Sequence, residues 1–331
     1  MHPTRRIPAL DTAVSALGFG CMGISWAYVS AEERDDDAGV AIIREALDSG
    51  VTFLDTADAY AGGHNEQVVG RALAESGAAP VVATKAGLVG NVVDGEIVMS
   101  RNGRPDHIRA ACDASLQRLG LEVIDLYYLH RVDPDVPLEE SWGAYAELAH
   151  AGKIRAAGLS EVSVEQASAA QAIHPVAAIQ SEFSLWARDA LGGGRTHDGA
   201  DAGDLITWTK EHQSIFVPFS PLGRGFLTGR VSVGDLKAGD FRTQLGRWQS
   251  DAVQANQAIV EGVRRVADRH GVTPAAIALA WVLAQGDHVI PIPGTTKSAN
   301  LQANLAALTV SLTTEDLAEL EGLPPAVGGR Y

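Results

Sequence analysis

Residues 51–60 have the sequence VTFLDTADAY, in which four apolar or β-branched residues are followed directly by polar ones. A short apolar run of this kind, bounded by polar residues, predicts a buried strand over residues 51–54. Residues 65–74 then show apolar side chains four positions apart, which is the spacing of a helix. This part of the chain therefore predicts one strand followed by one helix.

The same strand and helix unit recurs along the whole chain. Short apolar runs alternate with longer helical patterns, and this alternation predicts a parallel sheet built from βαβ units. One helix start, at Thr273 and Pro274, precedes a run at residues 275–284 that is apolar nearly all round and should be buried. The candidate strands are residues 16–20, 51–54, 81–84, 124–129, 156–159, 178–181, 215–218 and 289–292. Eight such units predict a single (β/α)8 TIM barrel domain over residues 1–331, with a C-terminal loop and extra helices.

An open doubly wound sheet is the structural alternative. Such a sheet normally carries a glycine-rich phosphate loop between its first strand and a helix. Gly18, Gly20 and Gly23 have a similar spacing, but residues 24–26 (ISW) follow them instead of a helix start. These glycines therefore do not form a dinucleotide-binding fingerprint, because no helix start follows them. Residues 192–203, rich in glycine and aspartate, predict a surface loop and no domain boundary.

The charge balance argues against nucleic acid as a partner. The chain has 26 basic and 41 acidic residues and a formal charge of −15, which opposes attraction to a phosphate backbone. No apolar run approaches the ~20 residues that a membrane-spanning helix needs, so no membrane role is expected. The composition, 46% hydrophobic and 20% charged, is typical of a soluble globular protein.

The N-terminus and the cysteines predict a cytoplasmic location. Arg5 and Arg6 could begin an export signal, but Pro8 interrupts the apolar stretch that should follow. Cys21 and Cys112 are too few for a disulfide framework in a chain of this size, which fits a reducing compartment. Cys112 lies on the apolar face of a predicted helix and is expected to be a small buried hydrophobe.

Polar side chains at the ends of three neighbouring candidate strands could carry chemistry. Asp55 and Tyr60 follow the strand at residues 51–54, Lys85 follows the next strand, and His130 follows the third. The working face of a parallel barrel lies at the carboxyl ends of its strands, so these side chains should meet. A nearby lysine ammonium lowers the pKa of a tyrosine, whose ordinary value is about 10. Together the four residues suit the reduction of a carbonyl group, with Tyr60 as the acid.

A metal site is the alternative use of these strand ends. Asp55, Asp58, His64 and His130 include side chains that bind metal ions. A metal site in a barrel usually presents paired histidines or several converging carboxylates, and Lys85 among them would repel the ion. We therefore expect no metal.

Several motifs make the chain resemble the aldo-keto reductase family. The segment FLDTADAY at residues 53–60, continuing to NEQVVGRAL at residues 65–73, is similar to the signature of that family. Other matching segments are Thr84-Lys85, Leu129-His130, Gly158-Leu159-Ser160, Gln180 and residues 219–223 (FSPLG). The resemblance implies that Asp55, Tyr60, Lys85 and His130 form the catalytic tetrad, with Tyr60 protonating the carbonyl oxygen as hydride arrives from a nicotinamide.

The resemblance also implies where NADPH would bind. Ser160 and Gln180 would hold the carboxamide, Phe219 would stack on the nicotinamide ring, and Cys21 and Met22 would lie near the ribose. The pyrophosphate would lie along Ser220, Pro221, Leu222, Arg224 and Gly225, and Asp55 is counted among the cofactor contacts. Glu161, which stands where many members carry asparagine, is not expected to be a cofactor ligand.

The choice of NADPH over NADH is argued from residues 292–297 (IPGTTK). A strand ends and a helix begins there, so backbone donors and the Lys297 cation make a phosphate site. The 2′-phosphate would contact Thr296 and Lys297, close to Gly294, with Asn300 and Asn304 facing the adenosine end. Asn300 and Ala303 are shorter or less polar than their counterparts in many relatives, so NADH is expected as a weaker alternative.

The substrate is expected to be a small-molecule carbonyl compound. Trp26 and Trp186, with Tyr28 and Trp248 as further candidates, would line an aromatic pocket. Two rival functions fit parts of the pattern: a regulatory NADPH-binding subunit with slow turnover, and a lyase or isomerase barrel that uses Tyr60 and Lys85 without a nucleotide. Binding of NADPH would argue against the lyase or isomerase, because only the reductase and the regulatory subunit need the nucleotide. Monomer is the default expectation for the assembly.

Overall fold

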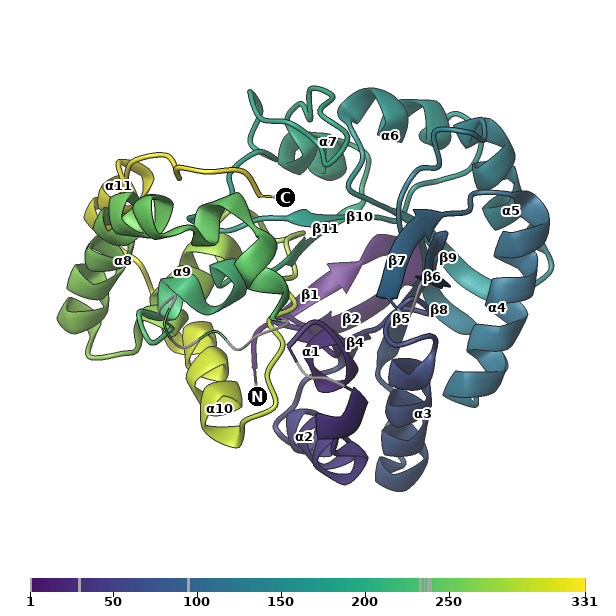
Figure 1. Ribbon diagram of the computed structural model, residues 1–331, viewed down its shortest axis with the longest axis horizontal. Coiled ribbons are helices and arrows are strands. Elements are labelled where there is room, and N and C mark those ends of the chain that lie inside the picture. The colour runs from purple at the N-terminus through teal and green to yellow at the C-terminus, as the bar shows by residue number, and fades with distance from the viewer. Residues whose placement is uncertain are drawn as a thin grey trace.

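Seven parallel strands form the main sheet of the computed structural model, which describes residues 2–28, 31–93, 96–231, 234, 236 and 240–330. The strands lie in the order β11-β10-β9-β8-β5-β4-β3 and curve into a barrel with helices around it (Figure 1). Their bounds are β3 (Phe19–Gly20), β4 (Phe53–Asp55), β5 (Val81–Ala86), β8 (Ile124–Leu129), β9 (Ile154–Ser160), β10 (Ala178–Glu182) and β11 (Ile215–Phe219). The predicted (β/α)8 barrel is confirmed.

The eighth predicted strand, residues 289–292, closes the barrel without forming a regular strand. An isolated bridge joins Val289 to Phe216 of β11. Further backbone hydrogen bonds run from Ile290 N to Phe216 O (2.9 Å) and from Gly18 N to Pro291 O (2.9 Å). The prediction of a regular strand was wrong because Pro291 has no N–H to donate to a ladder. The segment nevertheless joins the two ends of the sheet.

Helices follow the strands and cover the outside of the barrel (Figure 1). The predicted helix at residues 65–74 lies inside α3, and the helix predicted at residues 275–284 is α9, whose start is capped by the Thr273 side chain. Residues 275–282 are all buried, as their apolar pattern predicted. The helices are α1 (Met22–Ser25), α2 (Asp36–Asp48), α3 (His64–Ser76), α4 (Pro105–Leu119), α5 (Leu138–His150), α6 (Val164–Gln171), α7 (Leu205–Glu211), α8 (Ser250–His270), α9 (Pro274–Leu283), α10 (Ser298–Leu305) and α11 (Thr314–Glu321).

Two antiparallel hairpins lie outside the predicted pattern. The first, β1 (Thr4–Ile7) and β2 (Thr12–Ser15), contributes Ile7, Leu10 and Val14 to the apolar cluster inside the barrel. The second, β6 (Leu88–Val93) and β7 (Glu96–Arg101), follows β5. Arg101 of β7 pairs with Asp198 and so ties this hairpin to the loop at residues 192–203. That loop contains turns and one isolated bridge, as predicted.

The inward-facing side chains of the strands change from apolar to polar along the barrel axis. Phe53, Ala83, Leu126 and Ala178 belong to the apolar cluster in the interior. Successive side chains of a strand point to opposite faces, so every second residue lies on the same side. Two positions after three of these residues come Asp55, Lys85 and Gln180, which are buried as well. The alternation therefore places a charged layer directly above an apolar one.

Candidate active site

The Lys85 ammonium lies at the centre of the charged layer. It donates to a carboxylate oxygen of Asp55 at 2.5 Å, to the Thr56 carbonyl at 2.8 Å and to the Tyr60 hydroxyl at 3.4 Å. Lys85 is fully buried, and Asp55 and Tyr60 are 2% and 7% exposed. An unpaired buried ammonium would be very costly, so this arrangement depends on Asp55 being ionised beside it. The structure thus brings these three predicted residues together.

The local backbone explains how Tyr60 reaches Lys85. Asp55 ends β4, and the Tyr60 N–H then bonds to the Ala57 carbonyl (3.2 Å), which closes a turn. Ala61 has a φ of 54°, and Gly62 and Gly63 that follow it are also left-handed, which glycine tolerates best. This compact loop returns the chain over the end of β4 before α3 begins. Tyr60 lies in this loop, five residues after Asp55.

Burial has the largest effect on the acidity of Tyr60. Removal from water raises the pKa of Tyr60 above its ordinary value, and the Lys85 ammonium works against this rise. Lys85 lowers the pKa of Tyr60, as expected from the sequence. The expected net lowering of this pKa was wrong, because the effect of desolvation is larger than that of Lys85. Burial by itself lowers the pKa of Lys85, but Asp55 and Tyr60 reverse this and raise it. Tyr60 is therefore a protonated acid beside a charged lysine.

His130 lies across from Tyr60, with the ring centroids 5.9 Å apart and the rings nearly perpendicular. Burial, followed by the charges of Arg131 and Lys85, holds the pKa of His130 well below its ordinary value, so the imidazole is neutral. Among the described residues its Nδ1 has no hydrogen-bond partner. A neutral imidazole has one N–H to donate, and a buried polar atom without a partner is rare in proteins. His130 therefore has hydrogen-bonding capacity left for another group.

Arg131 is a residue of this site that the sequence argument missed. Its guanidinium donates to the Ser160 hydroxyl at 3.2 Å and to the carbonyl of His130 at 2.6 Å. It therefore fixes a predicted carboxamide ligand and contributes to the low pKa of His130. The only signal in the sequence was a cation directly after the strand-end histidine.

The second predicted carboxamide ligand, Gln180, bonds to the tetrad itself. Its side-chain amide donates to a carboxylate oxygen of Asp55 at 2.8 Å. Asp55 thus receives Lys85 on one oxygen and Gln180 on the other. Cys21 also lies against this layer, because its N–H bonds to the Asp55 carbonyl at 2.8 Å and burial raises the pKa of its thiol. A thiol in that state is not a nucleophile.

The two tryptophans predicted to line a substrate pocket lie in different surroundings. Trp26 stacks on Tyr60 with ring centroids 5.6 Å apart, so it covers one face of the Tyr60 ring. Trp186 stacks on Phe226 at 4.1 Å, packs edge-on against Trp248 at 5.7 Å, and is 3% exposed within the main apolar cluster. Trp26 therefore lies beside Tyr60 as predicted for a pocket residue. Trp186 is instead buried in the main apolar cluster.

The segment predicted to follow the pyrophosphate has unusual backbone geometry. Ser220, Gly223, Arg224 and Gly225 all have positive φ, between 48° and 98°. The Arg224 side chain is 7% exposed and pairs with Glu182 at the end of β10 (3.1 Å). Phe219 at the end of β11, Leu222 after it and Met22 at the start of α1 are partly exposed, whereas Pro221 is buried.

The residues predicted to contact the adenosine end lie around the start of α10. Gly294, Thr296 and Lys297 are exposed there, and the Lys297 N–H is held by the Thr295 hydroxyl (3.1 Å). Asn300 is partly exposed, and Asn304 is 3% exposed. Lys297 is thus an exposed cation at a helix start, and helix N-termini bind phosphate through their backbone N–H groups.

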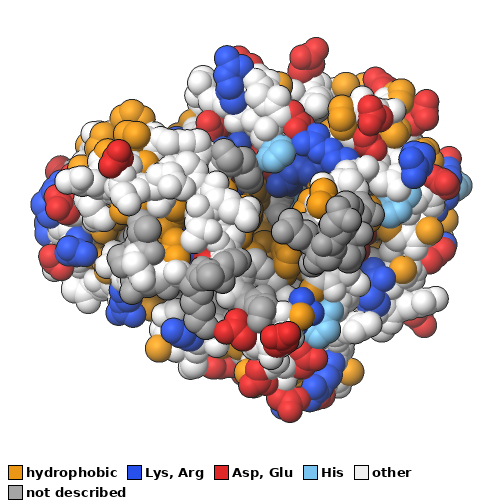
Figure 2. All heavy atoms as spheres, in the orientation of Figure 1, with side chains coloured by type: hydrophobic (Ala, Val, Ile, Leu, Met, Phe, Trp, Pro, Cys, Tyr) orange, Lys and Arg blue, Asp and Glu red, His pale blue; other side chains and the backbone are white. Residues whose placement is uncertain are grey.

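The face of the molecule in Figure 2 is hollowed near its middle, with apolar side chains and lysine or arginine side chains at the border of the hollow. Within the described part of the chain, no three histidine, cysteine, aspartate or glutamate side chains are grouped so that they could hold a metal ion. None of the helices described there is long and apolar enough to cross a membrane.

Known proteins match this chain along nearly its whole length. The model of the aldo/keto reductase family matches residues 16–324. A probable aldo-keto reductase 1 from Glycine max is 41% identical over 322 residues, which cover 96% of this chain and 88% of that protein. A glycerol dehydrogenase structure from Gluconobacter oxydans superposes with a TM-score of 0.84 at 32% identity, covering 96% of this chain and 94% of that one. An aldo/keto reductase from Klebsiella pneumoniae in complex with NADP and acetate has a TM-score of 0.69 at 27% identity, covering 99% and 98%.

Proposed function

The chain belongs to the aldo/keto reductase family of oxidoreductases, and from this premise we propose that it reduces an aldehyde or a ketone to the alcohol with NADPH. The observation that carries the proposal is the buried contact of Lys85 with both Asp55 and Tyr60, beside the neutral His130. A protonated tyrosine, a charged lysine and a neutral hydrogen-bond donor are the groups that protonation of a carbonyl oxygen requires.

Each residue of the tetrad has a separate task in the proposed reaction. Tyr60 donates its hydroxyl proton to the carbonyl oxygen, and the Lys85 ammonium stabilises the phenolate that remains until solvent returns a proton. Asp55 keeps Lys85 charged and in place, and His130 donates a hydrogen bond that orients the carbonyl. NADPH, when bound, supplies the hydride that the carbonyl carbon receives. The buried layer excludes water, which strengthens every one of these electrostatic contacts.

The residues present fit a nicotinamide cofactor. Ser160 at the end of β9 pairs with Gln180 of the adjacent β10, and Gln180 bonds to Asp55. The positive φ values of Ser220, Gly223, Arg224 and Gly225 resemble the backbone concavities that bind anions. Thr296 and Lys297 are exposed at the start of α10. The substrate is proposed to be a small carbonyl compound, and Trp26 over Tyr60 favours an apolar or aromatic one. Two buried free cysteines are consistent with a cytoplasmic location.

The direct test is to mix the purified protein with NADPH and a panel of aromatic and short-chain aldehydes and to follow the absorbance of the reduced nicotinamide. Consumption of NADPH that depends on the aldehyde supports the proposal. Tight binding of NADPH without consumption would favour a regulatory subunit instead. Absence of NADPH binding would favour a barrel that needs no nucleotide.

Lys297→Ala is expected to weaken NADPH binding by about tenfold or more, because it removes a charge-assisted contact to the 2′-phosphate. NADH has no such phosphate, so its affinity should change by less than about twofold. Fluorescence titration with each cofactor measures both constants. Lys210→Ala, at an exposed lysine in the last turn of α7, is the matched control. Equal losses for the two cofactors would show that Lys297 does not contact the phosphate.

The reduction rate, measured at falling pH, should show no change caused by protonation of His130. Its pKa is held well below the ordinary histidine value of about 6.5, so the imidazole stays neutral as the pH falls through that value. Initial reduction rates at saturating NADPH are therefore expected to show no change centred near the ordinary histidine pKa of about 6.5. A rate change centred near pH 6.5 in the wild type would contradict the neutral assignment.

A further inference from the structure

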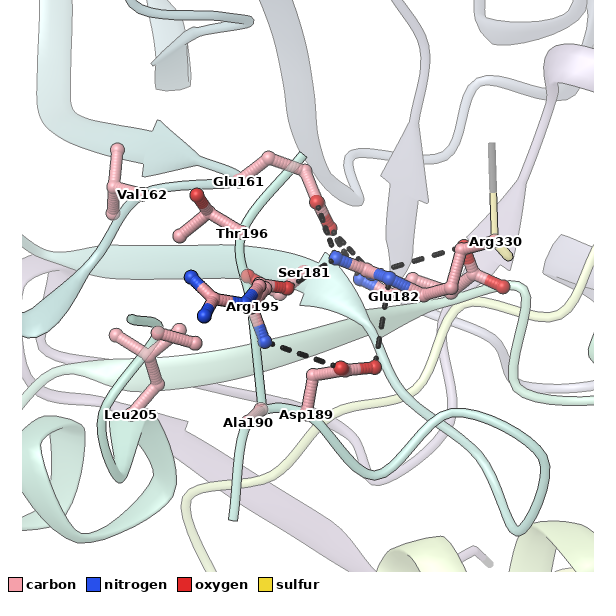
Figure 3. A pocket seen from close by; sticks show the side chains of 11 residues that line it. Glu161, Val162, Ser181, Glu182, Asp189, Ala190, Arg195, Thr196, Leu205 and Arg330 are labelled. Carbon is pink, nitrogen blue, oxygen red and sulfur yellow. Dashed lines mark hydrogen bonds and ion pairs between the residues drawn. The ribbon is translucent and has the colours of Figure 1, made fainter. Parts of the chain in front are cut away.

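A buried ionic cluster lies above the tetrad layer, at the ends of β9 and β10. Its acidic members are Glu161, Glu182 and Asp189, and the Arg330 guanidinium lies among them (Figure 3). Arg330 is 3.1 Å from the Glu161 carboxylate, 3.5 Å from Asp189 and 3.8 Å from Glu182. The side chains of Glu161, Glu182 and Arg330 are 1%, 4% and 9% exposed. No role proposed above uses this cluster.

The strands place this cluster directly next to the cofactor residues. Glu182 lies two positions after Gln180 on β10 and so faces the same side of the sheet. Glu161 follows Ser160, and its N–H bonds to the Gln180 carbonyl at 2.9 Å. One carboxylate oxygen of Glu161 accepts the Glu182 N–H at 2.8 Å, which joins the two strand ends. The cluster is therefore a direct extension of the proposed carboxamide site.

The segment that carries Arg330 is firmly attached to the rest of the molecule. Asn256, 1% exposed, bonds to both the N–H and the carbonyl of Val327, at 2.8 and 3.0 Å. The Arg247 N–H bonds to the Gly329 carbonyl, and the Arg247 side chain to the Gly328 carbonyl. In Figure 1 this part of the chain runs from α11 to the region above β10 and β11. The ordered backbone brings Arg330 to the carboxylates.

Charge compensation explains why an arginine stands at this position. Glu161 and Glu182 are joined at the two strand ends, and a buried carboxylate needs a cation or several donors to remain ionised. Glu182 also pairs with Arg224, which is predicted to lie along the pyrophosphate. Without Arg330, the two carboxylates would compete with a pyrophosphate for Arg224 and would add negative charge near it.

We propose that Arg330 is a positioning residue of the cofactor site, acting through Glu161 on the strand ends that carry Ser160 and Gln180 and through Glu182 on Arg224. This inference rests on the proposed binding of NADPH. Arg330 would support binding of the nicotinamide and pyrophosphate half of NADPH, whereas Lys297 would contact the 2′-phosphate of the adenosine half.

The test compares two ligands in the variant Arg330→Gln. The dissociation constant of NADPH is expected to rise by about tenfold or more, because a buried ion pair is broken beside Arg224. Adenosine 2′-monophosphate lacks the nicotinamide and both phosphates of the pyrophosphate, so its dissociation constant should stay within about twofold. At saturating NADPH, kcat should change much less than the KM for NADPH. Arg109→Gln, which breaks an exposed pair with Glu147, is the control.

A second substitution separates positioning from packing. Glu161→Gln keeps the acceptor for the Glu182 N–H but removes one buried charge, so the double variant Glu161→Gln/Arg330→Gln should recover part of the NADPH affinity. Arg330→Lys keeps the positive charge and should bind NADPH more tightly than Arg330→Gln. If Arg330→Gln does not fold, the affinity of Arg330→Lys for NADPH still tests the role of the charge. Unchanged NADPH binding in Arg330→Gln would overturn the inference, and so would equal weakening of both ligands or no recovery in the double variant. Failure of the wild type to bind NADPH would instead refute the proposed function.

Discussion

Tyr60→Phe is expected to lower kcat for aldehyde reduction by at least the ~10²-fold that loss of a general acid produces, with little change in NADPH affinity. The ring of Tyr60 packs between Trp26 and His130, and phenylalanine preserves these contacts while removing only the hydroxyl. Lys85 keeps its bonds to Asp55 and the Thr56 carbonyl, so the charged layer should survive. Single-turnover rates and cofactor titration measure the two effects separately.

The control for this variant is another buried tyrosine outside the tetrad. Tyr145 donates its hydroxyl to the Tyr128 carbonyl at 2.7 Å, and its ring packs on Trp142. Tyr145→Phe should cost stability of the order of one hydrogen bond, about 1 kcal/mol, and leave kcat nearly unchanged. Near-normal turnover in Tyr60→Phe would mean that the proton comes from another group.

Lys85→Met is expected to have the largest effect, because it damages both turnover and stability. Methionine is similar in length but uncharged, so the Asp55 carboxylate would be left buried with Gln180 as its remaining side-chain partner among the described residues. Breaking a buried ion pair from one side typically costs about 3–5 kcal/mol in the free energy of unfolding. Turnover should fall at least as far as in Tyr60→Phe, because the phenolate formed by proton donation would have no cation beside it.

The double variant Asp55→Asn/Lys85→Met distinguishes the two consequences. Removing both charges should recover most of the lost stability, since no unpaired carboxylate remains, but turnover should stay low. Chemical denaturation and steady-state rates provide the two measurements. Stability that falls further in the double variant than in Lys85→Met would contradict the description of Asp55 and Lys85 as a mutually compensating pair.

The sequence predicted those parts of the site that depend on strand periodicity. Asp55 and Lys85 lie at the ends of apolar runs, and the alternation of side chains on a parallel strand places such residues in one layer. The apolar run at residues 289–292 predicted a regular eighth strand, but Pro291 removes a ladder donor there, and the segment closes the barrel through a bridge to Phe216 and irregular backbone hydrogen bonds. Local apolar pattern therefore located the strand but not its pairing.

The sequence could not predict contacts between segments far apart in the chain. The pairing of Arg330 with Glu161 joins positions 169 residues apart, and no spacing rule connects them. Arg131 was missed because a cation after a strand end is usually solvated, and its bond to Ser160 depends on the barrel being closed. The net direction of the pKa of Tyr60 was also missed, because desolvation depends on burial that only the folded barrel provides.

The transfer of deuterium tests the central claim most directly. The protein is incubated with an aromatic aldehyde and NADPH in which both hydrogens at the reactive carbon of the nicotinamide are deuterium, and the alcohol is analysed by mass spectrometry. We predict one deuterium on the former carbonyl carbon in the wild type and at least ~10²-fold slower labelling in Tyr60→Phe. Alcohol without deuterium, or equal labelling rates in the two proteins, would contradict reduction by NADPH with Tyr60 as the proton donor.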